Sequence, residues 1–128
     1  MSDGNYHCYI NDLACRRATA VAEAEGLIAS ECYDEAEKAV IAADSSIYGA
    51  VEIAKMYRRR LEHLLAKGIE GRADREHAEA VFRRAARWAR SAFPEPHTAA
   101  EAEQYRDAAD HAVAELVRLF GYEPEPAA

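Results

Sequence analysis

Residues 34–67 read DEAEKAVIAADSSIYGAVEIAKMYRRRLEHLLAK, a stretch that contains no proline and no turn dipeptide. Its apolar residues recur at steps of three or four, which is the spacing of one face of a helix; they are Ala36, Val40, Ala43, Ile47, Val51, Ala54, Tyr57, Leu61 and Leu65. The segment Asp44–Gly49 weakens the pattern, because short polar side chains compete for backbone hydrogen bonds and glycine costs about 1 kcal/mol relative to alanine. We therefore predict one long central helix, with a bend at Asp44–Gly49 as an open alternative.

The length and composition of the chain favour a single core. The chain has 128 residues, half of them apolar, which is enough for one core and short for two ordinary domains. Alanine dominates the apolar half and buries little area, so helices must approach closely or bury surface against a second copy. We expect one helical domain over residues 11–121 between a flexible N-terminus (1–10) and a flexible acidic tail (122–128), and we expect a homodimer.

Capping signals precede the first helix and the central helix. Asn11 or Asp12 can accept hydrogen bonds from the first amides of a helix that runs to about Ser30. Asp34 and Glu37 have the spacing of a capping box, in which each side chain accepts a hydrogen bond from the backbone amide of the other. The short connection between the two helices predicts that they are antiparallel neighbours.

Two further helices follow the central one. Asp74 is expected to cap the third helix, which ends at the FPEPH segment 93–97 because proline lacks an amide hydrogen. Thr98 and Glu101 form a second capping box for the fourth helix, which Gly121 ends. Four amphipathic helices joined by short loops predict an all-α fold, an antiparallel four-helix bundle with a long central second helix.

Charge is distributed unevenly along the sequence. The net charge is −7, yet basic residues outnumber acidic ones between Lys55 and Arg90. This basic middle can serve an anionic ligand such as RNA, can pack against the acidic ends, or can be an ordinary solvated face. The candidate binding residues are four arginines of the third helix, namely Arg83, Arg84, Arg87 and Arg90.

Several functional classes receive no support from the sequence. The chain has no Cys-x-x-Cys pair and no Glu-x-x-His set, so we expect no metal site and no cofactor. Three cysteines fit reduced thiols better than a disulfide framework. The first residues lack the pattern of a signal peptide, and no apolar run is long enough to span a membrane, so we expect a cytoplasmic protein without membrane contact.

One pair on the last helix carries possible chemistry. A guanidinium such as that of Arg106 can hold a phosphate, while a nearby imidazole such as that of His111 moves a proton. This is the chemistry of a ribonuclease. Residues five apart lie about 140° apart around a helix, so a second subunit or a helix end would have to bring the pair together. Alternatively, both side chains are solvated residues of a helix face.

The chain from about Cys32 to Val113 resembles the HEPN superfamily of small all-helical bundles. The resemblance rests on the helix AVIAADSSIYGAVEIAK, a glycine-bearing loop, the segment DREHAEAVFRRAARW and a final alanine-rich helix. Family members with ribonuclease activity carry an arginine, a polar residue and then a histidine, the spacing of Arg106, Asp107 and His111. The resemblance implies that Arg106 binds phosphate, that Asp107 orients the pair and that His111 is the acid or base.

Three functions therefore stay open for this chain. The first is a binding or interaction module, non-catalytic and HEPN-like, in which an alanine-lined groove or the basic third helix docks a protein partner. The second is a metal-independent endoribonuclease of the HEPN type. The third is nucleic-acid binding, without catalysis, through the basic third helix, which would weaken steeply with salt.

Overall fold

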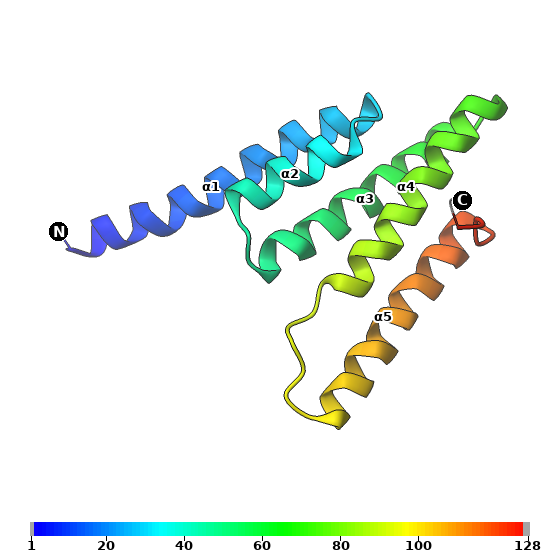
Figure 1. Ribbon diagram of the computed structural model, residues 1–128. Coiled ribbons are helices and arrows are strands. Elements are labelled where there is room, and N and C mark those ends of the chain that lie inside the picture. Colours follow the sequence, from blue (N-terminus) through cyan, green and yellow to red (C-terminus); the bar gives the residue numbers. More distant parts are fainter. Residues whose placement is uncertain (1, 127–128) are drawn as a thin grey trace. The chain divides into compact units, whose positions relative to one another are not determined.

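The computed structural model describes the backbone of residues 2–126 and the side chains of residues 12–126. Over that range the chain forms five helices and no strand (Figure 1), which confirms the all-α class. The chain divides into two compact units, Met1–Glu52 and Ile53–Ala128. Whether residues 11–121 fold together as one domain stays a prediction.

The predicted long central helix is wrong. Residues 34–67 belong to two helices, α2 (Tyr33–Ala43) and α3 (Ile47–Lys67), so the described residues form five helices rather than four. The break falls at the polar segment that the sequence marked as weak. The C-cap residue of α2, Asp44, is extended, with φ −153° and ψ 102°.

Local hydrogen bonds hold this break between α2 and α3. Asp44 Oδ1 accepts from the Ser46 amide at 2.9 Å and from the Ser46 hydroxyl at 2.5 Å. Ser46 Oγ in turn accepts from the Tyr48 amide at 3.2 Å. On its other oxygen, Asp44 accepts from Arg17 Nη1 of the first helix at 3.0 Å. Gly49 is required here, because a Cβ on it would lie 1.9 Å from the Asp44 carbonyl oxygen.

In the first unit, α1 (Ser2–Ala29) packs against α2. The two helices contact each other and lie side by side (Figure 1), as the short connection predicted. The predicted start at Asn11 or Asp12 is wrong, because the helix begins at Ser2; the predicted flexibility of residues 1–10 stays a prediction. The shared face is apolar, and its buried residues are Ala20, Val21, Ala24 and Ile28 of α1 with Ala36 and Val40 of α2.

The start of α2 differs from the predicted capping box. The helix begins at Tyr33, and its N-cap residue Cys32 makes no side-chain capping hydrogen bond. Asp34 therefore lies inside the first turn instead of capping it. An acidic residue there still interacts favourably with the positive end of the helix dipole.

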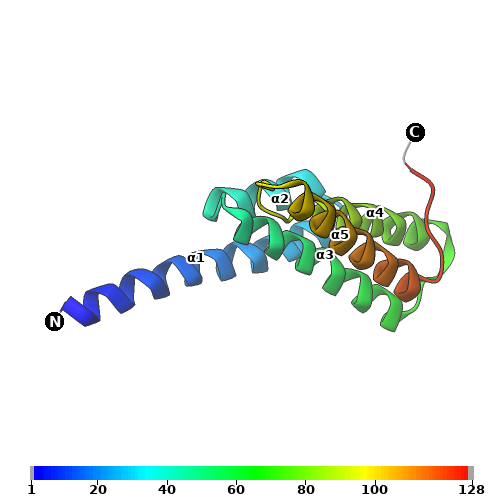
Figure 2. The same cartoon turned by 90° about the horizontal axis from the view of Figure 1, so that it is seen from below.

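The second unit consists of α3 from residue 53 onward, α4 (Gly71–Ser91) and α5 (Ala99–Phe120). These helices run side by side in both views (Figures 1 and 2). Their apolar faces form the core, in which the largest fully buried side chains are Tyr57, Ile53, Met56, Leu61 and Val81. Burying a large aliphatic side chain contributes about 1.5 to 3 kcal/mol, so this set contributes much of the driving force for folding of the unit.

The remaining capping predictions concern the start of α4 and both ends of α5. Asp74 does not cap α4, which starts at Gly71; its carboxylate instead accepts from the Glu70 amide at 3.2 Å. The predicted cap of α5 is confirmed, since Thr98 Oγ1 accepts from the Glu101 amide at 3.0 Å. Gly121 ends α5 with φ 98°, as predicted.

Replacing Gly49 by alanine should destabilise the first unit. The new Cβ would collide with the backbone carbonyl of Asp44, and a shift of that residue would disturb the hydrogen bonds that its side chain accepts from Ser46. We expect a loss of about 1 to 3 kcal/mol in the free energy of unfolding, measured by urea titration followed by circular dichroism. Gly26→Ala is the matched control: nothing lies within 4 Å of a Cβ at that helical position, so it should be neutral or stabilising. Equal losses of stability in Gly49→Ala and Gly26→Ala would contradict the close approach of residue 49 to the Asp44 carbonyl.

Asp44→Asn should give a pH-dependent loss of stability. Hydrogen bonds from the Ser46 hydroxyl and amide, with the contact to Arg17, hold the pKa of Asp44 below its ordinary value of 3.8. A lowered folded-state pKa means that the carboxylate stabilises the fold above the unfolded value and that this stability is lost as the pH falls through the folded value. We expect the variant to be about 1 to 2 kcal/mol less stable at pH 7, with the difference shrinking below about pH 4. If urea titration gives the same difference in the free energy of unfolding at pH 7 and at pH 2.5, the Asp44 carboxylate does not have this stabilising role.

Candidate functional site

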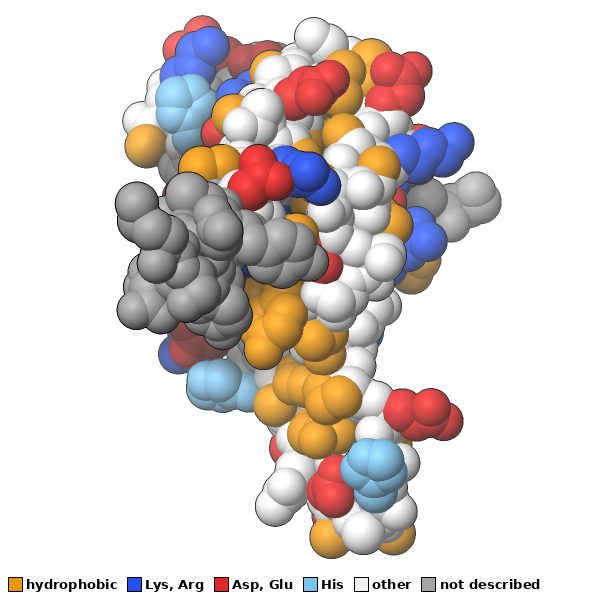
Figure 3. Space-filling view, turned by 90° about the vertical axis from the view of Figure 1, so that its left-hand side faces the viewer, with side chains coloured by type: hydrophobic (Ala, Val, Ile, Leu, Met, Phe, Trp, Pro, Cys, Tyr) orange, Lys and Arg blue, Asp and Glu red, His pale blue; other side chains and the backbone are white. Residues whose placement is uncertain are grey.

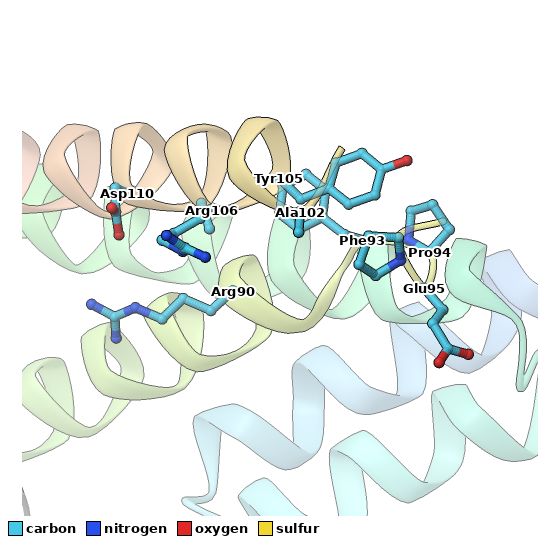
Figure 4. A pocket seen from close by; sticks show the side chains of 10 residues that line it. Arg90, Phe93, Pro94, Glu95, Ala102, Tyr105, Arg106 and Asp110 are labelled. Atoms are coloured by element: carbon cyan, nitrogen blue, oxygen red, sulfur yellow. The ribbon is translucent and has the colours of Figure 1, made fainter. Parts of the chain in front are cut away.

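A groove lies where the end of α4, the following connection and the first turns of α5 meet. We call it the α4–α5 groove; its volume is about 430 Å³, and Figure 4 shows the side chains around it. In the space-filling view, hydrophobic side chains gather at the level of this connection (Figure 3). The groove is lined by Arg90, Phe93, Pro94, Glu95, Pro96, Ala102, Tyr105, Arg106, Ala109 and Asp110.

An aromatic pair forms one wall of the α4–α5 groove. The rings of Phe93 and Tyr105 stack with centroids 5.4 Å apart and an angle of 20° between their planes. The chain reaches this arrangement because Pro94 prevents α4 from continuing and Thr98 caps the start of α5. The stacked rings give the groove an apolar surface on which a flat or aliphatic group of a ligand can pack.

Two arginines reach into the same groove from different helices. Arg106 of α5 points toward α4, into the space along which the Arg90 side chain extends (Figure 4). Both residues are exposed, and neither guanidinium forms a hydrogen bond or ion pair with the residues that the structure describes. Unpaired guanidinium groups that converge can hold a carboxylate or a phosphate through two parallel hydrogen bonds.

Two acidic side chains limit the positive charge of the groove. Asp110 lies one turn after Arg106 and points into the groove, and Glu95 lies on the connection (Figure 4). The positive charges of the two guanidinium groups are balanced by the negative charges of the two carboxylates. The groove therefore suits a ligand with one anionic group better than a polyanion.

The structure separates the residues of the predicted ribonuclease motif. Arg106 lines the groove, whereas Asp107 and His111 are exposed residues of α5 that do not line it. His111 Nε2 lies 3.6 Å from Glu115 Oε1, and Glu115 also lies 3.9 Å from Arg58 Nη2 of α3. Within one chain, Arg106 is thus brought together with Arg90 and not with His111.

The four arginines predicted as a binding set do not form one open stripe. Arg83, Arg87 and Arg90 follow a spacing of four and three residues and fall within an arc of about 60°. Arg83 is engaged: its Nη2 lies 3.3 Å from Glu79 Oε2, and its Nε donates to the Glu125 carbonyl at 2.7 Å. Arg84 is half-buried and has a partner. Only Arg87 and Arg90 of this set therefore remain exposed without a side-chain partner among the described residues.

Sequence reasoning named Arg90 and Arg106 but missed their convergence and missed the aromatic pair. The segment between the two helices contains residues that indicate their proximity. Pro94 and Thr98 mark the end of one helix and the start of the next, so the side chains that flank this segment must lie near each other. Which of them face each other depends on the rotation of the two helices about their axes, which spacing within one helix does not reveal.

Within the described part of the chain, the structure has neither a cluster of metal-ligating side chains nor a membrane-spanning helix. No group of three or more His, Cys, Asp or Glu residues there could hold a metal ion. Cys15 and Cys32 are free thiols, while the side chain of Cys8 lies outside the described residues. None of the helices described is long and apolar enough to cross a membrane.

Comparison with known proteins found no matching family model, no matching curated protein and no matching solved structure.

Proposed function

We propose that the protein is a small helical binding module that docks a segment of a partner protein in the α4–α5 groove. Arg90 and Arg106 hold one carboxylate of the partner, and an apolar side chain beside that carboxylate packs on the stacked rings of Phe93 and Tyr105. The observation that carries this proposal is the convergence of two unpaired guanidinium groups next to an aromatic wall. Charge-assisted hydrogen bonds beside a buried aromatic contact are the usual components of a binding hot spot.

The location, family and oligomeric state that we propose for the module are those expected from the sequence. We propose a cytoplasmic, non-catalytic protein related to the HEPN bundles, in which the helices form an antiparallel bundle and two copies form a homodimer. The helices α3 and α4, the larger part of α5 and the glycines at 68 and 71 fall in the region of the resemblance. Small alanine side chains on these helices support close packing within a chain or between copies.

A carboxylate probe should bind the α4–α5 groove and require both arginines. N-acetyl-phenylalanine carries one carboxylate beside one aromatic ring. In the corresponding amide, N-acetyl-phenylalaninamide, a neutral carboxamide replaces that carboxylate. We expect the acid to shift the backbone amide resonances of residues 92–106 in an NMR titration, with millimolar affinity. Arg90→Gln and Arg106→Gln should each weaken binding about tenfold, since a hydrogen bond to a charged group contributes roughly 1.5 to 3 kcal/mol.

Arg72→Gln is the matched control for this titration. Arg72 is also an exposed arginine of α4, and its ion pair is with Glu76, one turn away on the same helix. The control should bind the probe like the unchanged protein. The proposal fails if the amide binds as well as the acid, or if Arg72→Gln weakens binding as much as Arg106→Gln.

A metal-independent ribonuclease is the second candidate function. It is favoured by the exposure of His111, whose side chain is 72% accessible, and by the unpaired guanidinium of Arg106. The two groups lie on different sides of α5, so the reaction would need Arg106 and His111 from different copies. Nucleic-acid binding without catalysis has less support, because Arg83 and Arg84 already have partners within the chain.

An RNA degradation assay distinguishes the ribonuclease from the binding module. If the chain is a ribonuclease, cleavage continues in EDTA and falls at least a hundredfold in His111→Ala, since loss of a general acid or base typically costs that much. His111 is exposed, so its removal should leave the melting temperature unchanged. Cleavage that persists in His111→Ala would indicate a contaminating enzyme, and no cleavage at all would leave the binding module as the surviving function.

A further inference from the structure

The segment after α5 turns back and lies against α4 (Figures 1 and 2). Residues 122–126 read Tyr-Glu-Pro-Glu-Pro, and the sequence predicted a loose tail there. The structure places Pro124 in a buried position, while the predicted flexibility of residues 122–128 stays a prediction. The Glu125 carbonyl accepts from Arg83 Nε at 2.7 Å, so the backbone of the tail is held as well as one of its side chains.

The tail and α4 enclose a second groove, which we call the tail groove. Its helical side consists of Phe82, Arg83, Ala86 and Arg90, and its other side is residues 123–126. The volume between them is about 530 Å³, so the tail covers the helix face without filling the space. This groove differs from the α4–α5 groove, and Arg90 is the one residue that lines both.

Aromatic rings fix the point at which the tail leaves α5. Phe120 stacks on Phe82 of α4 with ring centroids 5.4 Å apart, and Tyr122 packs on Phe120 at 4.6 Å. The Tyr122 hydroxyl donates to Glu79 Oε1 at 3.0 Å. Partial burial and this carboxylate raise the pKa of Tyr122 above its ordinary value. The start of the tail is thus anchored, and residues 123–126 continue from this anchor along α4.

The contacts of residues 123–126 are of a kind that many other segments can make. Proline restricts the backbone to an extended form, so such a segment loses little entropy when it binds. A buried proline ring and a carbonyl held by an arginine do not require a particular neighbouring side chain. Glu123 and Glu125 are exposed and line the tail groove together with Arg83 and Arg90. Opposite charges around one groove favour an acidic segment.

We infer that the helical side of the tail groove is a second binding surface, which takes an acidic, proline-containing extended segment of another protein. In the free chain, residues 123–126 occupy this surface. A tethered segment has an effective concentration of the order of millimolar, so it competes with weak partners and yields to a partner that makes further contacts. This surface shares Arg90 with the α4–α5 groove, but the inference does not rest on the function proposed for that groove.

The test uses the full-length chain and a synthetic peptide of residues 122–128 with a fluorescent label at its N-terminus. In the variant Pro124→Gly/Pro126→Gly, the tail of the chain itself should bind its groove poorly and leave the surface open. We expect the peptide to bind this variant at least tenfold more tightly than it binds the unchanged chain, measured by fluorescence anisotropy. Adding Arg83→Gln to the variant should weaken binding at least tenfold, because the arginine that holds the carbonyl is lost.

Three controls make the result decisive. A peptide with both prolines replaced by glycine should not bind the opened variant. This control remains informative even if the chain with Arg83→Gln does not fold. Arg72→Gln and Arg106→Gln, each in the opened variant, should leave peptide affinity unchanged, which separates this surface from the α4–α5 groove. The inference is overturned if the opened variant keeps its helical circular dichroism but does not bind the peptide, or if the glycine peptide binds equally well.

Discussion

Close packing of the last helices is the constraint on which both grooves depend. Ala78, Ala85 and Ala86 of α4 and Ala109 of α5 are buried. The distance between packed helices is set by the side chains at the contact, so alanines bring the backbones close together. Arg90 and Arg106 lie along the edge of this contact with the stacked rings of Phe93 and Tyr105, where they line the α4–α5 groove.

The sequence predicted helices well where a side chain or a glycine fixes their ends. Thr98 and Gly121 bound α5 as expected, because a capping hydroxyl and a left-handed glycine act within a few residues. The central helix was predicted wrongly, because the step of four from Ala43 to Ile47 continues the apolar pattern across a real break. Hydrogen bonds from Ser46 to Asp44 outweigh that pattern locally.

The candidate site was predicted only in part, for a related reason. Arg90 and Arg106 were each named from patterns on their own helices, and the structure shows that they meet. Spacing along one helix tells which residues share a face, but not which face of the next helix lies opposite. The contacts of the tail with Arg83 were missed because they join residues 42 positions apart.

Arg90 is the residue through which one groove can influence the other. It lines both of them, and a guanidinium that turns toward an anion in one groove is withdrawn from the other. Occupancy of the α4–α5 groove should therefore alter the strength with which the tail groove holds its segment, and the reverse must hold to the same degree. A single side chain is enough for such coupling, without any change in the backbone.

The lengths of the connections bear on the order in which the chain folds. The turns at 30–32 and 68–70 join helices that are adjacent in sequence, and closing a short loop costs little entropy. Pairs of helices joined in this way assemble quickly, because their contacts are local. The segment 92–98 is longer and contains two prolines, so α5 should add last during synthesis. Both grooves are completed only at that step, and a nascent chain therefore exposes the arginines of α4 before any binding surface exists.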